Sequence, residues 1–189
     1  LLLQSFKQHI HLTPEEEETL VSYFQPKVCA RKEMLLEEGR IAHEVAFVIS
    51  GCLRSYSIDD KGLEHNIQFA PSGWWITDMY SFISTKPSLL FTDALEESEV
   101  YLLSRQKQLE LFDAIPKTER YFRILTENSL CSSRQRVVDN LSLTAKERYV
   151  HFCSVYPTLI HHLAQKHIAS YIGVTPEFLS KMRSQLLRE

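Results

Sequence analysis

The sequence has no long apolar run and no closely spaced cysteine pair. No stretch approaches the roughly 20 apolar residues of a membrane-spanning helix, and the N-terminus has no basic and apolar segments with a cleavage site. The four cysteines include no Cys-x-x-Cys pair, so they lack the spacing of zinc-ribbon or iron–sulfur ligands, and we interpret them as buried or half-buried thiols. We expect a cytoplasmic protein with no membrane partner, metal or cofactor.

Motifs of common catalytic sites are also missing. The sequence contains no Gly-x-Ser-x-Gly, Walker loop or Gly-x-Gly-x-x-Gly. A cupin-type metal site needs a His-x-His pair with further ligands on facing strands, whereas His43 and His65 each stand alone in the segment with strand character. The sequence therefore predicts no enzymatic activity.

Charge is distributed unevenly along the chain, although the whole has a net charge of only −3. Residues 1–115 hold 10 Lys and Arg against 18 Asp and Glu, a net charge of −8. Residues 116–142 have a net charge of +2 (5 against 3), and residues 143–189 one of +3 (6 against 3). The basic charge lies where contacts to nucleic-acid phosphates would be needed.

The first half of the chain has the pattern of short helices followed by short strands. Thr13-Pro14-Glu15-Glu16 is a helix start, with Thr13 as N-cap and Pro14 at the first helical position. From Lys27 to Ser104, β-branched and aromatic residues partly alternate in short segments. Four of the five glycines are spaced there by 12, 11 and 11 residues, as expected for turns in an all-β jelly roll.

Helical periodicity returns after Ser104. We expect a short helix over 106–114, a long one from Lys117 to about Leu141, and a third over 144–156. The long helix would be about 37 Å, more than a small β-domain needs for itself. We interpret it as a dimerisation helix; the alternative is a helix that folds back on its own domain. The predicted dimer stripe consists of Tyr121, Ile124, Leu125, Asn128, Cys131 and Gln135, and Val138 and Leu141 continue it.

The most specific pattern lies between Gln165 and Arg183. A helix-turn-helix needs a small residue where its helices cross and a turn residue that tolerates positive φ; Ala169 and Gly173 meet these needs. Thr175 is the N-cap of the second helix, and Pro176 is its first residue. The apolar positions that would face inward are Ile168, Ile172, Val174, Leu179 and Met182.

The second helix then turns a polar face outward. The N-terminal half of a recognition helix meets base edges in the major groove, and the first helix crosses the DNA backbone. We assign Glu177 and Lys181 to base readout, because a carboxylate accepts from cytosine and a lysine donates to guanine. Pro176 lies beside them, and Ser180 would contact a base or a phosphate. The predicted phosphate contacts are Lys166, His167, Thr175 and Arg183.

These features resemble the catabolite activator and FNR (Crp/Fnr) family of bacterial regulators over nearly the whole chain. The resemblance is carried by Val48-Ile49-Ser50-Gly51, Pro71-Ser72-Gly73 and the run from Ile168 to Ser180, which is similar to a variant common in Bacteroidetes. It implies an α+β fold with a cyclic-nucleotide-binding-like β-roll (1–115), a long dimerisation helix (116–142) and a C-terminal, winged-helix-like helix-turn-helix domain (143–189). The implied partners are a second copy, a pseudo-palindromic double-stranded DNA and RNA polymerase.

The effector cassette of that family is where the sequence departs from it. Cyclic-nucleotide binders carry a Gly-Glu pair for the ribose and an Arg followed by Ser or Thr for the phosphate; the matching positions here are Thr77-Asp78 and Ser88-Leu89. Serine cannot replace the bidentate ionic contact of arginine with phosphate. We therefore expect no response to cyclic AMP.

Two alternatives remain open at this stage. The first is a regulator gated by a nucleotide or another small effector in a modified pocket, whose candidate residues are Trp75, Thr77, Asp78, Met79, Ser88 and Leu89. The second is a protein-interaction module that has lost DNA binding. If the long helices pair across a two-fold axis, DNA half-sites about 34 to 36 Å apart are expected.

Overall fold

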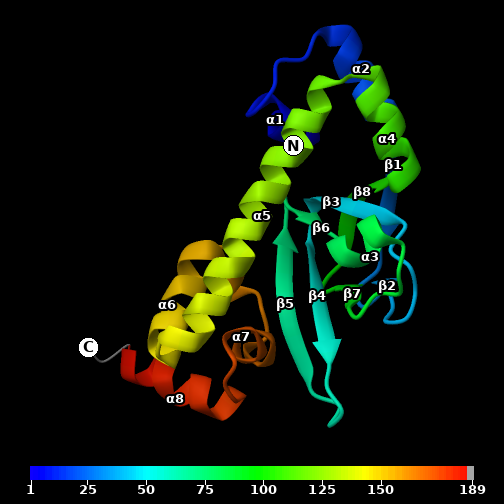
Figure 1. Ribbon diagram of the computed structural model, residues 1–189. Helices are drawn as coiled ribbons and strands as arrows, with labels where there is room; N and C mark the ends of the chain where they lie inside the picture. Colours follow the sequence, from blue (N-terminus) through cyan, green and yellow to red (C-terminus); the bar gives the residue numbers. More distant parts are fainter. Residues whose placement is uncertain (187–189) are drawn as a thin grey trace. The chain divides into compact units, whose positions relative to one another are not determined.

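The computed structural model describes residues 1–186 and divides into two units (Figure 1). The first unit comprises Leu1–Ser57 and Ile67–Glu127. The second comprises Ile58–Asn66 and the described residues from Asn128 onward. A hairpin tip from the β-rich half of the sequence is thus grouped with the C-terminal helices.

The first unit contains a β-roll of two sheets. One sheet has the order β1 (Gln25–Cys29), β8 (Ser98–Ser104), β3 (Glu44–Ser50), β6 (Trp75–Ile76). The other has the order β2 (Met34–Leu36), β7 (Phe91–Ala94), β4 (Cys52–Ile58), β5 (Glu64–Pro71). The helix α3 (Met79–Ser84) lies between β6 and β7 in the sequence. The predicted jelly-roll class is confirmed.

The inner faces of the sheets pack against each other through small and branched side chains. This core contains the buried residues Cys29, Ala46, Val48, Leu53, Ala70, Ile76, Ala94, Val100 and Leu102. Alternation along β3 places Val45 and Phe47 on the opposite face, where the N-terminal helices pack. Because both faces of β3 are covered, the interior of this strand is a continuous run of apolar residues.

Helices cover the outer face of the first sheet. These are α1 (Leu2–Lys7), α2 (Pro14–Ser22), α4 (Arg105–Ala114) and the start of α5 (Lys117–Ser142). Phe6, Phe47, Leu111 and Tyr121 are fully buried in this core. The α2 start is as predicted, since Thr13 and Glu16 form a capping box.

The second unit holds the remaining helices. They are α6 (Ala145–Val155), the 3₁₀ turn η1 (Leu159–His161), α7 (Gln165–Ile172) and α8 (Pro176–Leu186). Thr144 and Glu147 form a second capping box at the start of α6, and α6 ends before Pro157, as the sequence indicates. None of the helices within residues 1–186 is both long and apolar enough to cross a membrane.

Candidate functional site

The helix-turn-helix geometry forms as the sequence predicts. Gly173 ends α7 with φ 73° and ψ 42°, the left-handed conformation that glycine adopts without steric cost. The Thr175 Oγ1 accepts a hydrogen bond of 3.2 Å from the Phe178 N–H, which caps α8. The side chains buried between the helices are Ile168, Ala169, Ile172, Leu179 and Met182, and Val174 is half-buried.

The opposite face of α8 is open to solvent. Its exposed residues are Pro176, Glu177, Ser180, Lys181 and Ser184. Hydrogen bonds from its own backbone amide and from Thr175 lower the pKa of Glu177, so its carboxylate is ionised at neutral pH. The face therefore presents one acceptor and one cation, Lys181, a helical turn apart, and both are accessible to a base pair.

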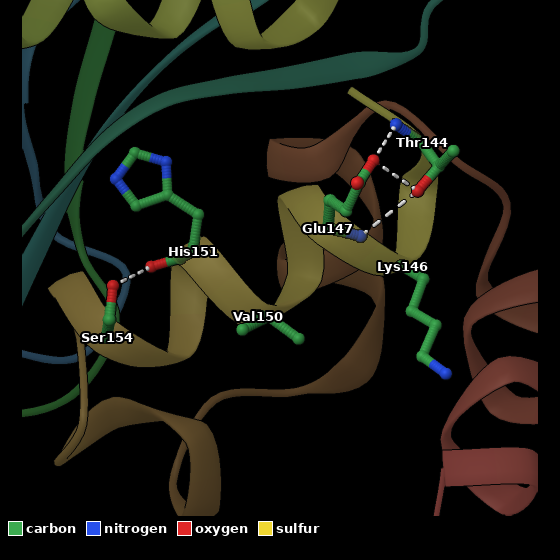
Figure 2. A pocket seen from close by; sticks show the side chains of 6 residues that line it. All are labelled: Thr144, Lys146, Glu147, Val150, His151 and Ser154. Carbon is green, nitrogen blue, oxygen red and sulfur yellow. Dashed lines mark hydrogen bonds between the residues drawn. The ribbon is translucent and has the colours of Figure 1, made fainter.

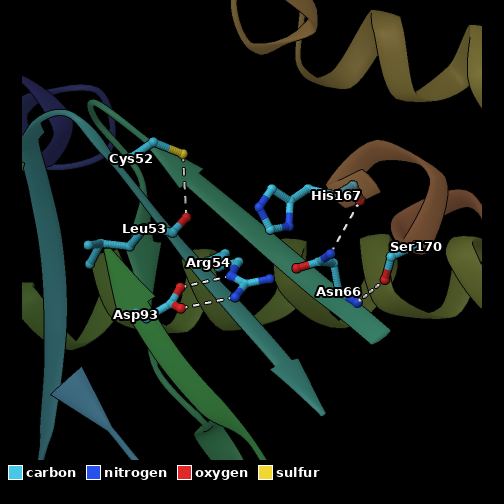
Figure 3. Close-up of polar contacts among 7 residues, drawn as sticks. All are labelled: Cys52, Leu53, Arg54, Asn66, Asp93, His167 and Ser170. Atoms are coloured by element: carbon cyan, nitrogen blue, oxygen red, sulfur yellow. Dashed lines mark hydrogen bonds and ion pairs between the residues drawn. The ribbon is translucent and has the colours of Figure 1, made fainter. Parts of the chain in front are cut away.

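The four candidate phosphate contacts differ in exposure. Lys166 and Thr175 are exposed. Arg183 is half-buried, and its guanidinium carbon lies 6.0 Å from the centre of the Tyr149 ring. His167 was expected to contact a phosphate, but it is only 9% exposed. Its backbone carbonyl accepts a hydrogen bond of 3.3 Å from Asn66 Nδ2 (Figure 3). A buried imidazole is not available to a phosphate in this arrangement.

The expected dimer stripe on α5 is wrong at its beginning. Tyr121 is fully buried: its ring stacks on Phe6 at 3.8 Å, and its hydroxyl hydrogen-bonds to Ser5 and Trp75. Leu125 is half-buried and packs on the same core, and Ile124 is also half-buried. Asn128, Cys131 and Gln135 are exposed. The first turns of α5 therefore fold back on their own unit, the alternative that the sequence left open.

Apolar side chains are nevertheless exposed on the second half of α5. Leu130, Val137 and Val138 are 52%, 59% and 51% exposed, and Leu141 is 83% exposed. With Cys131, they occupy one side of the helix, since all five lie within about 120° around its axis at 3.6 residues per turn. The sequence stripe included Cys131 and its continuation to Val138 and Leu141 but not Leu130 or Val137. Apolar pattern alone does not tell which face a second helix covers.

The six candidate effector residues do not converge on one pocket. Trp75 donates to the Tyr121 hydroxyl at 2.9 Å and packs in the aromatic core, on the helical side of its sheet. Met79 and Leu89 are exposed, and the Thr77 hydroxyl donates to the Glu44 carbonyl at 2.9 Å. The grouping expected from the sequence is therefore not observed.

The two cassette positions that remain, Asp78 and Ser88, hydrogen-bond to each other. The Ser88 hydroxyl donates to Asp78 Oδ2 at 2.7 Å, and both residues are buried. Asp78 also caps α3 by accepting from the amides of Tyr80 and Ser81. The carboxylate that would meet a ribose is thus already engaged within the protein.

Two polar pairs between β4 and β7 were not expected from the sequence. Arg54 and Asp93 form a buried bidentate ion pair at 2.8 and 3.0 Å (Figure 3). On the other face, Ser55 and Thr92 are register partners, and alternation turns them inward with Leu53 and Ala94. Within residues 1–186, Ser55 Oγ and Thr92 Oγ1 are buried without a hydrogen-bond partner. Composition does not predict these pairs, because they form only when the strand register places the residues opposite each other.

The cysteines differ in accessibility. Cys29 and Cys52 are buried, Cys153 is half-buried, and Cys131 is exposed, contrary to expectation. Burial raises the pKa of the Cys52 thiol to about 12, which keeps it protonated and unreactive. No group of three or more side chains able to hold a metal ion occurs in the part of the chain that the structure describes.

An open hollow follows one side of α6 and is lined by Thr144, Lys146, Glu147, Val150, His151 and Ser154 (Figure 2). The Glu147 carboxylate accepts from the Thr144 amide and hydroxyl. The Ser154 hydroxyl donates to the His151 carbonyl at 2.7 Å. These polar groups stabilise α6 itself and do not converge on a ligand.

Comparison with known proteins agrees with this architecture. Residues 26–114 match the family model described as cyclic nucleotide-binding domain. FixK2 from Bradyrhizobium japonicum superposes with a TM-score of 0.76 at 21% identity, over 87% of this chain and 85% of that one. A sequence search of curated proteins finds no significant match.

Two further solved structures are similar. The c-di-GMP-responsive global regulator CLP from Xanthomonas campestris has a TM-score of 0.73 at 15% identity, over 93% of this chain and 92% of that one. The catabolite activator protein of Thermus thermophilus has a TM-score of 0.61 at 21% identity, over 94% and 84%. Residues 26–114 thus match the cyclic nucleotide-binding domain model, and the chain has the fold of FixK2, CLP and the catabolite activator protein.

Proposed function

We propose that this chain is a cytoplasmic transcription regulator that binds a specific DNA sequence as a homodimer and does not respond to cyclic AMP. The observation that carries the proposal is the complete helix-turn-helix, whose buried side fixes α8 while Glu177, Ser180 and Lys181 stay exposed. In this geometry, the N-terminal half of α8 enters the major groove and α7 crosses the backbone. The proposed division is a sensor over 1–115, a connector helix over 116–142 and a DNA-binding part over 143–189.

Dimerisation is supported by the exposed apolar side of α5. Four large aliphatic residues exposed along one helix are costly in water, and pairing with the same helix of a second copy would bury them. The proposed interface therefore lies on the second half of α5, after Glu127, and not on the stripe that begins at Tyr121. RNA polymerase remains a proposed partner by analogy with the fold.

Independence from cyclic AMP is supported by the cassette. Ser88 stands where an arginine would bind the cyclic phosphate, and it donates instead to Asp78. No cation replaces the arginine at Ser88-Leu89, so a buried phosphate would lack its ionic partner there. Calorimetric titration with cyclic AMP should show no micromolar binding, and tight binding would refute this part of the proposal.

A second candidate, an effector-gated regulator, is favoured by one observation. The unpartnered hydroxyls of Ser55 and Thr92 face the interior of the roll. Buried hydroxyls usually have partners, and a small ligand with hydrogen-bonding groups would supply them. Such a ligand would stabilise the wild type against unfolding but not the Ser55→Ala, Thr92→Val double variant.

Selection from a library of randomised duplexes tests the main proposal. The retained DNA is sequenced after binding at two salt concentrations, without added ligand. Recovery of a palindromic motif would establish a dimeric regulator that needs no effector. Retention without sequence preference, lost at the higher salt concentration, would contradict sequence-specific readout by the free protein.

A further inference from the structure

The hairpin tip of residues 58–66 hydrogen-bonds directly to the first helix of the helix-turn-helix. The Ser170 hydroxyl on α7 donates to the Glu64 carbonyl at 2.6 Å and accepts from the Asn66 amide at 2.9 Å. One side chain therefore joins two backbone groups of the hairpin. Figure 3 shows the Ser170 hydroxyl beside the backbone amide of Asn66, while the Asn66 side chain reaches the backbone carbonyl of His167.

Arg136 on α5 also hydrogen-bonds to both the hairpin tip and α7. Its Nη2 donates to the Asn66 carbonyl at 2.7 Å and to the Tyr171 carbonyl at 3.2 Å. Its guanidinium carbon also lies 4.0 Å from the centre of the Tyr171 ring, a cation–π distance. Asn66 is 1% exposed as a result, so hairpin, α5 and α7 are held together by charge-assisted and buried hydrogen bonds.

The hairpin tip is acidic. It carries Asp59, Asp60 and Glu64 against a single Lys61. Asp59 accepts from the amides of Lys61 and Leu63 and pairs with His65 at 2.9 Å. The hydrogen bond with His65 contributes most to lowering the pKa of the Asp59 carboxyl, so this group stays negative at neutral pH.

An acidic segment on α7 is poorly placed for a DNA-binding protein. The first helix of a helix-turn-helix crosses the sugar-phosphate backbone, and carboxylates beside phosphates repel them. Asn66 also binds the carbonyl of His167, a residue that the sequence assigns to a phosphate contact. The arrangement with the hairpin tip on α7 therefore opposes docking of the exposed face of α8 on DNA.

We propose that residues 58–66 form an autoinhibitory latch on α7, with Ser170 as its catch, and that DNA binding requires its release. The inference rests on the proposed DNA-binding function. The tip is continuous with β4 and β5, two strands of the sensor roll. A conformational change in the roll can therefore be transmitted along the backbone to the contact with Ser170. The free energy needed to break the contacts between the hairpin tip and α7 would couple the sensor roll to the DNA-binding surface.

The test measures the affinity of the full chain for the selected duplex by fluorescence anisotropy. Ser170→Ala removes both hydrogen bonds of the Ser170 hydroxyl and should tighten binding about thirtyfold, since each bond contributes on the order of 1 kcal/mol to the latched state. Ser170→Thr keeps the hydroxyl and should bind like the wild type. Ser154→Ala is the matched control, because its hydroxyl contacts only the His151 carbonyl of its own helix.

Hydrogen exchange on the wild type provides a second measurement that needs no variant. The Asn66 amide donates to Ser170 in the latched state, so its exchange should accelerate when DNA is bound. Unchanged affinity of Ser170→Ala, or an Asn66 amide that stays protected on DNA, would overturn the latch and leave DNA binding intact. Failure of every variant to bind any duplex would overturn DNA binding itself, and the latch with it.

Discussion

At the residue scale, Lys181 carries the prediction about base readout. Lys181→Ala should cost about 1 to 3 kcal/mol on the selected duplex and much less on an unrelated one, because an exposed lysine of a recognition helix donates to guanine. Competition binding on the two duplexes measures the difference. Lys86→Ala, which removes an exposed lysine of the sensor unit, is the control. Equal losses on both duplexes would make Lys181 a phosphate contact instead.

Asp139 carries a prediction about pH. Its carboxylate accepts from Gln135 Nε2 at 2.8 Å and pairs with His151 Nδ1 at 2.6 Å, which joins α5 to α6. The Gln135 hydrogen bond, followed by His151, lowers the pKa of Asp139 in the folded state. The stabilisation is therefore present above the unfolded pKa of about 3.9 and is lost as the pH falls through the lower folded value.

Urea unfolding of the wild type and Asp139→Asn between pH 3 and pH 7 checks this sign. The wild type should be the more stable protein at pH 7, and the difference should shrink below about pH 4. Asp113→Asn, at an exposed position of α4, should show no such trend. A difference that grows toward acid pH would contradict the account.

Individual side chains were the hardest features to predict. The buried positions of the helix-turn-helix were predicted from the sequence because a single motif contains all of them. It did not give the burial of Tyr121, because the partner Phe6 lies 115 residues earlier and only the folded chain brings them together. The burial of His167 was not predicted for the same reason, since the residue that binds its carbonyl is Asn66 of a distant hairpin.

At the element scale, Gly51 in the β3–β4 turn is the most constrained of the five glycines. It has φ +83°, and an added Cβ would lie 2.6 Å from the Glu97 carbonyl oxygen. Gly51→Ala should therefore destabilise the protein by more than the roughly 1 kcal/mol of a positive-φ penalty alone. Gly62→Ala, at φ +78° with no atom within 4 Å of the added Cβ, isolates that penalty. Equal midpoints of thermal unfolding for the two variants would contradict the steric argument.

The second half of α5 carries the prediction about association. Leu141→Glu places a charge at the most exposed apolar position of the helix and should shift the dimer toward monomer in sedimentation velocity without loss of helicity. Ser142→Glu adds the same charge at the next exposed position, about 100° around the helix, and should weaken the dimer less. A monomeric wild type, or a Leu141→Glu protein that stays dimeric, would remove the interface from this face.

Elements with strong periodicity were predicted well, and weak ones were not. The β-rich region from Lys27 to Ser104 was identified from alternation and regularly spaced glycines, and the starts of α2 and α8 were identified from their caps. The strands β2 and β6 were missed because they span three and two residues, too few to show a period. The helix α3 was missed because its N-cap, Asp78, was interpreted as an effector ligand.

At the scale of the whole molecule, fold and motif both support the proposed regulator, in which a sensor roll precedes a DNA-binding unit. The order of parts was readable from the sequence because charge, glycine spacing and helical periodicity change along the chain. The grouping of residues 58–66 with the C-terminal helices was not readable. Backbone groups of this hairpin hydrogen-bond to the Ser170 hydroxyl, a long-range contact that no local sequence pattern encodes.

The central claim is sequence-specific binding of DNA by this chain, and competition between the selected palindrome and a scrambled duplex tests it most directly. The account predicts at least about a thousandfold preference for the palindrome at physiological salt, with affinity for both duplexes falling as salt rises. Equal affinity for the two duplexes at every salt concentration would contradict it.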